Sequence, residues 1–139
     1  MSLIQWSEDY SVGIKDMDEE HKKLIEIINT LYDAMKIGKS KDVLEKVFSD
    51  LLSYTTVHFT DEELLMENNN YPGLVDQRNQ HNQFVAKIEE QYEKFKSGFS
   101  LVSVEIMNFL KEWLLNHIKQ YDKKYGAYLN EKGIFWKIN

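Results

Sequence analysis

The chain has 139 residues, of which 42% are hydrophobic and 13% aromatic, and this suits one compact domain with a buried core. Its net charge of −6 argues against a nucleic-acid partner, because phosphate binding needs a clustered basic face. The absence of cysteine excludes a disulfide framework, an iron–sulfur cluster, a thiolate zinc site and a cysteine nucleophile.

The sequence has no stretch near the roughly 20 consecutive apolar residues that a membrane-spanning helix needs. The N-terminal segment also lacks the basic and apolar regions of a secretory signal peptide. We therefore expect a cytoplasmic protein with no membrane partner, and we expect a monomer. One proline and six glycines leave room for long uninterrupted helices.

The first helical pattern covers roughly residues 16–37. Apolar residues recur in it at three- and four-residue spacing, as on one face of a helix. They are Met17, Leu24, Ile25, Ile28, Leu31, Tyr32 and Met35. His21 lies inside this apolar stripe, and Gly38 marks the expected end of the helix.

The second pattern covers roughly residues 40–69, and its inner face carries two polar side chains. The other members of this face are Leu44, Val47, Phe48, Leu51, Thr55, Phe59, Leu65 and Met66. His58 and Glu62 lie among them. A run of asparagines followed by Tyr71 and Pro72 predicts a turn after this helix.

The third pattern covers roughly residues 72–97, with Pro72 acceptable in the first turn and Gly98 beyond the end. Its stripe consists of Leu74, Gln77, His81, Phe84, Val85, Ile88, Tyr92 and Phe95. The stripe therefore contains another histidine together with a glutamine four residues before it.

The fourth pattern covers roughly residues 100–126 and begins at Ser100 or Ser103, while Gly126 breaks the periodicity at its end. Its core face consists of Ile106, Met107, Leu110, Leu114, Ile118 and Tyr121, with His117 among them. This helix supplies the last of the four histidines.

Short connections between long helices imply antiparallel neighbours. We therefore predict an all-α fold in which residues 1–139 form a single domain, an antiparallel up-down-up-down four-helix bundle. The N-terminal arm, residues 1–15, is expected to pack across the bundle. A short C-terminal tail with Ile134, Phe135 and Trp136 either docks on the body or meets a partner.

The four histidines fall on the apolar stripes of four different expected helices. A single histidine in such a place is more often an ordinary hydrogen-bonded core residue than a ligand. Glu62 is more informative, because a carboxylate on an inner face is costly unless it is paired or bound to a metal. Four imidazoles and two carboxylates on inner faces together predict a metal centre inside the bundle.

The spacing of these residues supports one shared centre. His58 and Glu62 are four residues apart and point the same way along a helix. His117 and Asp122 are five residues apart, a rotation of roughly 140° on a regular helix. They converge only if the helix is distorted there or the aspartate reaches round.

The ligand types narrow the choice of metal. Imidazole with carboxylate suits iron, zinc, manganese or copper better than calcium or magnesium. Two carboxylates among several imidazoles favour a dinuclear centre over a single tetrahedral zinc ion. The paired Glu-x-x-His motifs of ferritin-like di-iron proteins do not occur.

Four segments contain the candidate ligands in chain order: His21, His58-Phe-Thr-Asp-Glu62, Gln77-Arg-Asn-Gln-His81 and His117-Ile-Lys-Gln-Tyr-Asp122. Together they resemble the hemerythrin family, and the bacterial hemerythrins in particular. The likeness extends to Ile4-Gln-Trp6 and Tyr10-Ser-Val-Gly-Ile14 in the arm, to the Tyr71-Pro72 turn, and to Trp113-Leu-Leu-Asn-His117.

This resemblance implies a centre of two non-haem iron ions, bridged by carboxylates and by an oxo or hydroxo group. Glu62 and Asp122 would be the bridging carboxylates. Leu114, one turn before the histidine of the fourth helix, would line the pocket for O2 and keep it dry.

The resemblance also divides the histidines between the two irons. His21 and His58 would hold the iron that leaves a position open for O2, and His81 and His117 would hold the other. The family pattern has a fifth histidine where this chain has Gln77. Whether Gln77 binds iron through its oxygen, leaves the place to water or leaves it empty stays open.

Three functions follow as hypotheses. The first is an O2-binding protein for oxygen carriage, storage or delivery, not an enzyme, with a reductase or an acceptor protein as a partner. The second is a peroxidase- or oxidase-like di-iron enzyme, with Tyr54, Tyr121 and Tyr125 as candidate electron donors. The third is a sensor of O2, NO or iron that uses the C-terminal tail as its partner surface.

Overall fold

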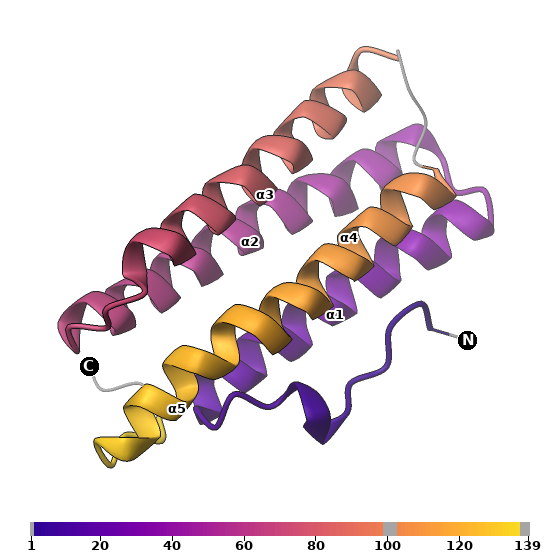
Figure 1. Cartoon of the computed structure of the whole chain (residues 1–139). Helices are drawn as coiled ribbons and strands as arrows, with labels where there is room; N and C mark the ends of the chain where they lie inside the picture. Colours follow the sequence, from indigo (N-terminus) through magenta and orange to yellow (C-terminus); the bar gives the residue numbers. More distant parts are fainter. Residues whose placement is uncertain (1, 99–102, 137–139) are drawn as a thin grey trace.

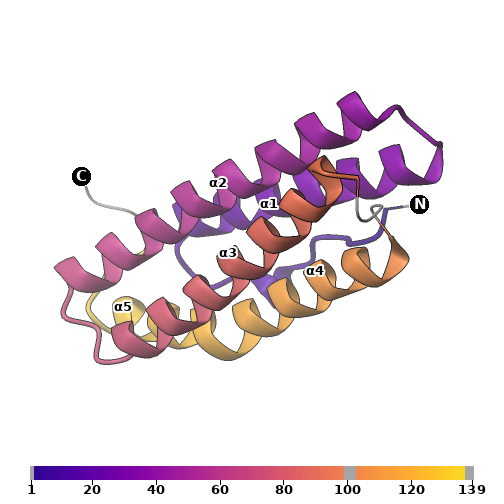
Figure 2. The ribbon, with the colours of Figure 1, turned by 90° about the horizontal axis from the view of Figure 1, so that it is seen from above.

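Four long helices lie side by side in the computed structural model, which describes residues 2–98 and 103–136 (Figure 1). They are α1 (Lys15–Lys36), α2 (Lys41–Asn68), α3 (Leu74–Lys96) and α4 (Val104–His117). Successive helices run in opposite directions, and Figure 2 shows the same arrangement from above. The described residues form no strand, so the prediction of an all-α, up-down-up-down bundle is confirmed.

Two helices begin where the sequence predicted, and in both a serine caps the first turn. Ser40 caps α2 by accepting a hydrogen bond from the Val43 backbone nitrogen, and Ser103 caps α4 in the same way from Ile106. Ser100, the alternative start, lies outside the described residues. Helix α3 begins at Leu74 rather than at Pro72, because Pro72 belongs to the turn that precedes the helix.

The fourth helix continues past Gly126, where the sequence predicted its end. After α4 the chain forms a π-helical turn, η2 (Ile118–Asp122), and then α5 (Lys123–Glu131). A Cβ atom on Gly126 would lie 1.9 Å from the backbone oxygen of Val12. This glycine does not stop the helix, and its missing side chain allows the N-terminal arm to lie directly against α5.

The N-terminal arm packs across the bundle, as predicted (Figure 1). It contains the short helix η1 (Glu8–Tyr10), and Ile4, Val12 and Ile14 enter the hydrophobic core. Asn29 of α1 exchanges two hydrogen bonds with the backbone of Ile4, at 2.9 and 2.8 Å. These polar contacts hold the arm in one register over α1.

The C-terminal tail returns to the start of α1. The carbonyl of Phe135 accepts a hydrogen bond of 2.9 Å from the backbone nitrogen of Lys15, and Ile134 packs against the core. Phe135 and Trp136 remain 48% and 58% exposed. The tail is therefore docked through Ile134 and its backbone, while a partner for the two exposed aromatic rings stays a prediction.

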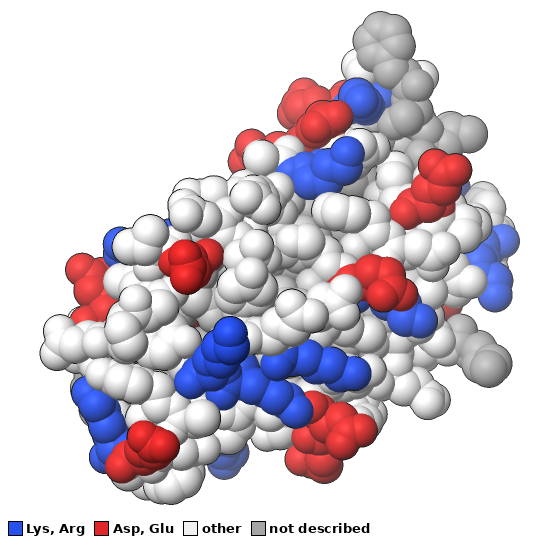
Figure 3. All heavy atoms as spheres, in the orientation of Figure 1, with Lys and Arg blue, Asp and Glu red and all other residues white. Residues whose placement is uncertain are grey.

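Acidic and basic side chains alternate over the face seen in Figure 3, with one group of neighbouring Lys or Arg side chains near its lower edge. Such mixing is typical of solvated helix surfaces. Among the described residues, no helix is long and apolar enough to cross a membrane.

Candidate metal centre

Among the described residues, the bundle core contains six buried histidine, glutamate and aspartate side chains, and each is at most 2% exposed. They are His21 on α1, His58 and Glu62 on α2, His81 on α3, His117 on α4, and Asp122 on η2. The structure therefore brings every strongly predicted site residue into the same interior region.

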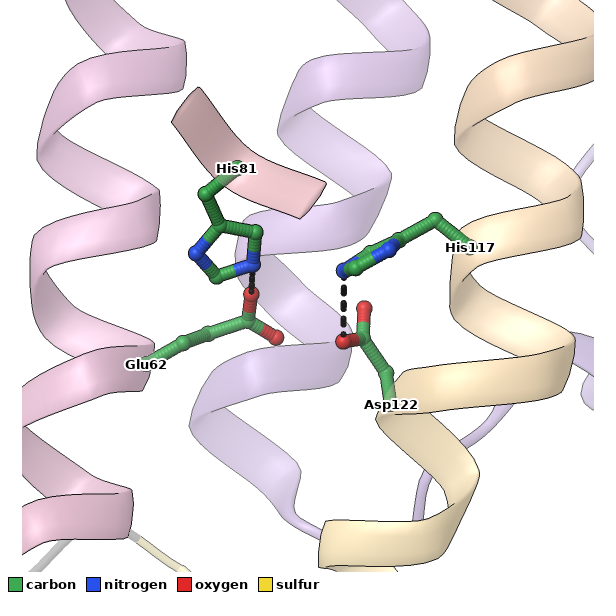
Figure 4. A group of neighbouring side chains, drawn as sticks. All are labelled: Glu62, His81, His117 and Asp122. Carbon is green, nitrogen blue, oxygen red and sulfur yellow. Dashed lines mark ion pairs between the residues drawn. The ribbon is translucent and has the colours of Figure 1, made fainter. Parts of the chain in front are cut away.

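These side chains form two groups that share Glu62. One group is His21, His58 and Glu62, and the other is Glu62, His81, His117 and Asp122. Within each group the potential ligand atoms all lie within 4.8 Å of one another. Figure 4 shows the four side chains of the second group pointing toward one another, with His117 and Asp122 on the same continuous helix.

The two carboxylates connect the groups. Glu62 Oε1 lies 3.1 Å from His58 Nε2 and 3.4 Å from His81 Nε2. Asp122 Oδ1 lies 3.1 Å from His117 Nε2, whereas its Oδ2 lies 3.2 Å from His21 Nε2. Each carboxylate thus faces imidazoles from both groups, as a bridging carboxylate must.

The π-helical turn explains how His117 and Asp122 meet despite their five-residue spacing. In η2 the backbone nitrogen of Lys123 bonds to the carbonyl of Ile118, the i→i+5 pattern of a π-helix. The wider turn cancels the rotation that a regular helix would introduce between the two side chains. The sequence left open whether the helix is distorted here or the aspartate reaches round, and the structure shows a distortion, a π-turn.

Two further predicted residues are buried in the bundle. Gln77 is 1% exposed, and its Nε2 donates a hydrogen bond of 3.0 Å to Asp122 Oδ1. Leu114 is 1% exposed and belongs to the hydrophobic core one turn before His117. The position of Leu114 is compatible with an apolar wall beside the centre.

The donor atoms fit a metal of the iron or zinc class. Several of the buried nitrogen and oxygen atoms at the centre form no hydrogen bond within the described part of the chain: His58 Nε2, His81 Nε2, His117 Nε2 and Glu62 Oε1. Buried polar atoms without partners are costly, and imidazole nitrogens with carboxylate oxygens are the ligands that such metals prefer. A bound metal would satisfy all of them at once.

Comparisons with known proteins agree with this geometry. Residues 12–129 match the family model described as "Hemerythrin HHE cation binding domain". The chain is 34% identical to a bacteriohemerythrin of Pseudomonas aeruginosa over 125 residues, covering 90% of this chain and 80% of that one. The chain belongs to the hemerythrin family. As a family member it also resembles the myohemerythrin of Theromyzon tessulatum, with 36% identity over 125 residues that cover 90% of this chain and 92% of that one.

Solved hemerythrin structures share the fold. A wild-type hemerythrin crystal structure superimposes with a TM-score of 0.87 at 27% identity, covering 91% of this chain and 97% of that one. The hemerythrin fold therefore extends over nearly the whole chain, including the helices that carry the six buried histidine, glutamate and aspartate side chains.

Two glutamates that sequence reasoning missed orient histidines of this hemerythrin-family centre. Glu20 Oε1 lies 2.7 Å from His58 Nδ1, and Glu63 Oε2 lies 2.9 Å from His81 Nδ1. Such partners fix the ring orientation and leave the opposite nitrogen for a metal. Glu20 directly precedes His21 and Glu63 directly follows Glu62, so adjacency to a candidate ligand was the only available signal.

The three tyrosines proposed as electron donors take different places. Tyr125 is fully buried, and its hydroxyl donates a hydrogen bond to Glu62 Oε2. The Tyr121 ring stacks on His117, with ring centroids 5.2 Å apart. Tyr54 is half-buried, and burial, followed by the charges of Glu20 and a neighbouring aspartate, raises its pKa to about 12.

The same contacts shift the pKa values of the imidazoles. Burial alone would lower the pKa of His21, but hydrogen bonds to Asp122 and Glu62 outweigh it and raise the pKa from 6.5 to about 10. For His81, the carboxylates of Glu62 and Glu63 likewise overcome the effect of burial and raise the pKa to about 9. The metal-free centre therefore holds protons where a metal would bind.

The pKa values of the two carboxylates shift in the opposite direction. Burial would raise the pKa of Glu62, but the charge of His58 and hydrogen bonds from the surrounding imidazoles hold it well below its usual value. Burial and the charge of Glu62 would raise the pKa of Asp122. The contact with His117 outweighs both effects and lowers this pKa to about 2. Both groups are ionised at neutral pH.

These shifts predict the pH dependence of stability for the metal-free protein. The raised pKa values of His21 and His81 stabilise the fold, and this stabilisation is complete below pH 6.5. It is lost as the pH rises through about 9 to 10. The lowered pKa of Asp122 stabilises the fold at pH values above 3.8, the usual pKa of an aspartate. This stabilisation is lost as the pH falls toward about 2. We expect the free energy of unfolding to be greatest between about pH 4.5 and about pH 6.5.

Thermal denaturation at about pH 5.5 and about pH 9.5 measures this dependence. We expect the metal-free protein to melt at a lower temperature at the higher pH. The melting temperature of the metal-loaded protein should fall much less, because the metal replaces the protons at the centre. Equal melting temperatures of the metal-free protein at both pH values would contradict the assigned ion pairs.

Proposed function

We propose that this chain is a non-haem di-iron protein that binds O2 reversibly. The observation that carries the proposal is Glu62, which is shared by two groups of buried ligand atoms and therefore suits a bridge between two metal ions. Membership of the hemerythrin family supports iron as the metal. Fold alone would not support a function, because bundles carry many chemistries.

The proposed ligand assignment follows the two groups. His21 and His58 would hold one iron, His81 and His117 would hold the other, and Glu62 and Asp122 would supply ligand atoms to both. When bound, a pair of ferrous ions supplies the two electrons through which O2 is held.

The surrounding side chains keep the centre dry and fixed. Leu114, buried among core residues one turn before His117, excludes water from the O2 position. Glu20 and Glu63 hold the rings of His58 and His81, and water exclusion strengthens every electrostatic contact inside. Tyr125 stays protonated and keeps donating to Glu62, since burial and the nearby carboxylates raise its pKa well above the usual value.

Iron analysis of anaerobically purified, reduced protein tests the proposal, together with visible spectra as O2 is admitted and removed. We expect two irons per chain and a charge-transfer band that appears with O2 and disappears when O2 is removed. One iron or none would refute the dinuclear centre. Two irons with only irreversible oxidation would refute reversible binding and favour redox chemistry or sensing.

As part of the same proposal, the protein acts in the cytoplasm as a monomer and is kept reduced by a reductase. The half-buried ring of Tyr121, stacked on His117, supports an electron path between the centre and the surface. Analytical ultracentrifugation of the iron-loaded protein checks the oligomeric state. A mass of two or more chains would contradict the monomer.

A further inference from the structure

Gln77 is a buried amide that touches the metal-binding cluster at one atom. Its Nε2 donates to Asp122 Oδ1 at 3.0 Å, and the same oxygen lies 3.1 Å from His117 Nε2. The amide therefore lies beside a carboxylate that faces both groups of ligands, on the side of the centre formed by His81 and His117.

The direction of this hydrogen bond determines what Gln77 does. An amide nitrogen is a donor without a lone pair available to a metal, whereas the amide oxygen is an acceptor. Turning the amide over would place Oε1 against the carboxylate of Asp122, so that two acceptor atoms faced each other. Gln77 is therefore a positioning residue for Asp122 and not a metal ligand.

The oxygen of Gln77 is left without a partner. Oε1 is buried and forms no hydrogen bond to any residue that the structure describes. A buried acceptor is costly unless a ligand or an ordered water donates to it. Gln77 thus offers an acceptor to a small molecule that carries a proton and lies next to the centre.

The number of ligands in the second group also indicates an open position on the metal. It contains two imidazoles and two carboxylates, and iron with such ligands keeps open positions where the protein supplies no further donor. A surface hollow of about 300 Å³ between α2 and α3 is lined by Phe59, Glu63 and His81. The hollow therefore reaches the ring of His81, which belongs to this group.

We propose that the iron held by His81 and His117 has its own exchangeable position, in addition to the O2 position of the other iron. Water or hydroxide occupies it, donates a hydrogen bond to Gln77 Oε1, and exchanges for a small monoanion with loss of that hydrogen bond. This inference rests on the proposed di-iron function and adds to it a second binding position created by Gln77.

Azide is the probe, because it is a small monoanion that binds open positions on ferric iron. Calorimetric titration of the oxidised, iron-loaded protein is expected to give two azide ions per chain, and one for Gln77→His, in which an imidazole fills the position. One azide per chain in the unsubstituted protein, or two in Gln77→His, would overturn the inference.

Iron content, measured before each titration, separates the two proposals. Fewer than two irons per chain overturns both, whereas two irons with a single azide overturns only the second position. The crystal structure of the iron-loaded protein gives a readout that needs no variant. A ligand density between the iron and Gln77 supports the inference, and a bond from Gln77 Oε1 to iron overturns it.

Discussion

Iron binding is expected to be lost when Glu62 is replaced by Gln. The carboxylate belongs to both groups of ligand atoms, and its Oε1 and Oε2 approach imidazoles of three different helices. It is also one of two buried negative charges that offset the repulsion between two iron ions at close range. Removing its charge weakens both metal positions at once, so we expect iron content near zero.

Iron analysis after loading, with circular dichroism to confirm the helical fold, measures this effect. Glu67→Gln is the matched control, since Glu67 lies on the same helix, is 58% exposed and pairs only with Arg78 among the ion pairs found. The control should bind iron like the unsubstituted protein. Two irons retained by Glu62→Gln would show that Glu62 does not bridge the metals.

A large loss of stability is expected for Gly126→Ala, although alanine is the better helix former. The new Cβ would lie 1.9 Å from the backbone oxygen of Val12, and a backbone atom cannot move aside as a flexible side chain can. Either the N-terminal arm or α5 must shift. We expect a net destabilisation of about 1–3 kcal/mol and a melting temperature lower by roughly 5–10 °C.

Thermal denaturation of the metal-free variant measures the change, and Ala127→Gly at the neighbouring exposed position provides the comparison. That substitution should cost only the roughly 1 kcal/mol difference in helix propensity between alanine and glycine. A Gly126→Ala variant that is as stable as the unsubstituted protein would mean that the arm does not lie against α5.

The helices and their inner faces were predictable because helical periodicity is a local property of the chain. The recurrence of apolar residues placed His21, His58, His81 and His117 on the inner faces of four helices, and the structure confirms that all four are buried. The costly position of Glu62 on such a face indicated a metal centre before any contact was known.

The predicted end of the fourth helix was wrong, because the role of Gly126 depends on a contact with a distant part of the chain. Gly126 has the form of a helix terminator, but its function depends on Val12, a residue more than a hundred positions earlier in the chain. Only packing of the arm against α5 shows that the missing side chain is a requirement for close approach.

Glu20 and Glu63 were missed for a related reason. Their relation to His58 and His81 crosses from one helix to another, so it depends on how the helices are rotated and spaced. In the sequence they are two of the many acidic residues of an acidic chain, and only their adjacency to His21 and Glu62 distinguishes them from solvated surface charges.

The sequence by itself determined the all-α class, the inward positions of the ligand residues, and that His117 and Asp122 meet only through a distorted helix or an aspartate that reaches round. Each of these follows from spacing along one helix, because side-chain direction repeats with the helical period. Tertiary structure alone decided that the distortion is a π-turn, that Glu62 joins two groups, and that Gln77 binds Asp122 through its amide nitrogen. Those outcomes depend on distances between helices, which arise from packing and have no counterpart in the order of residues.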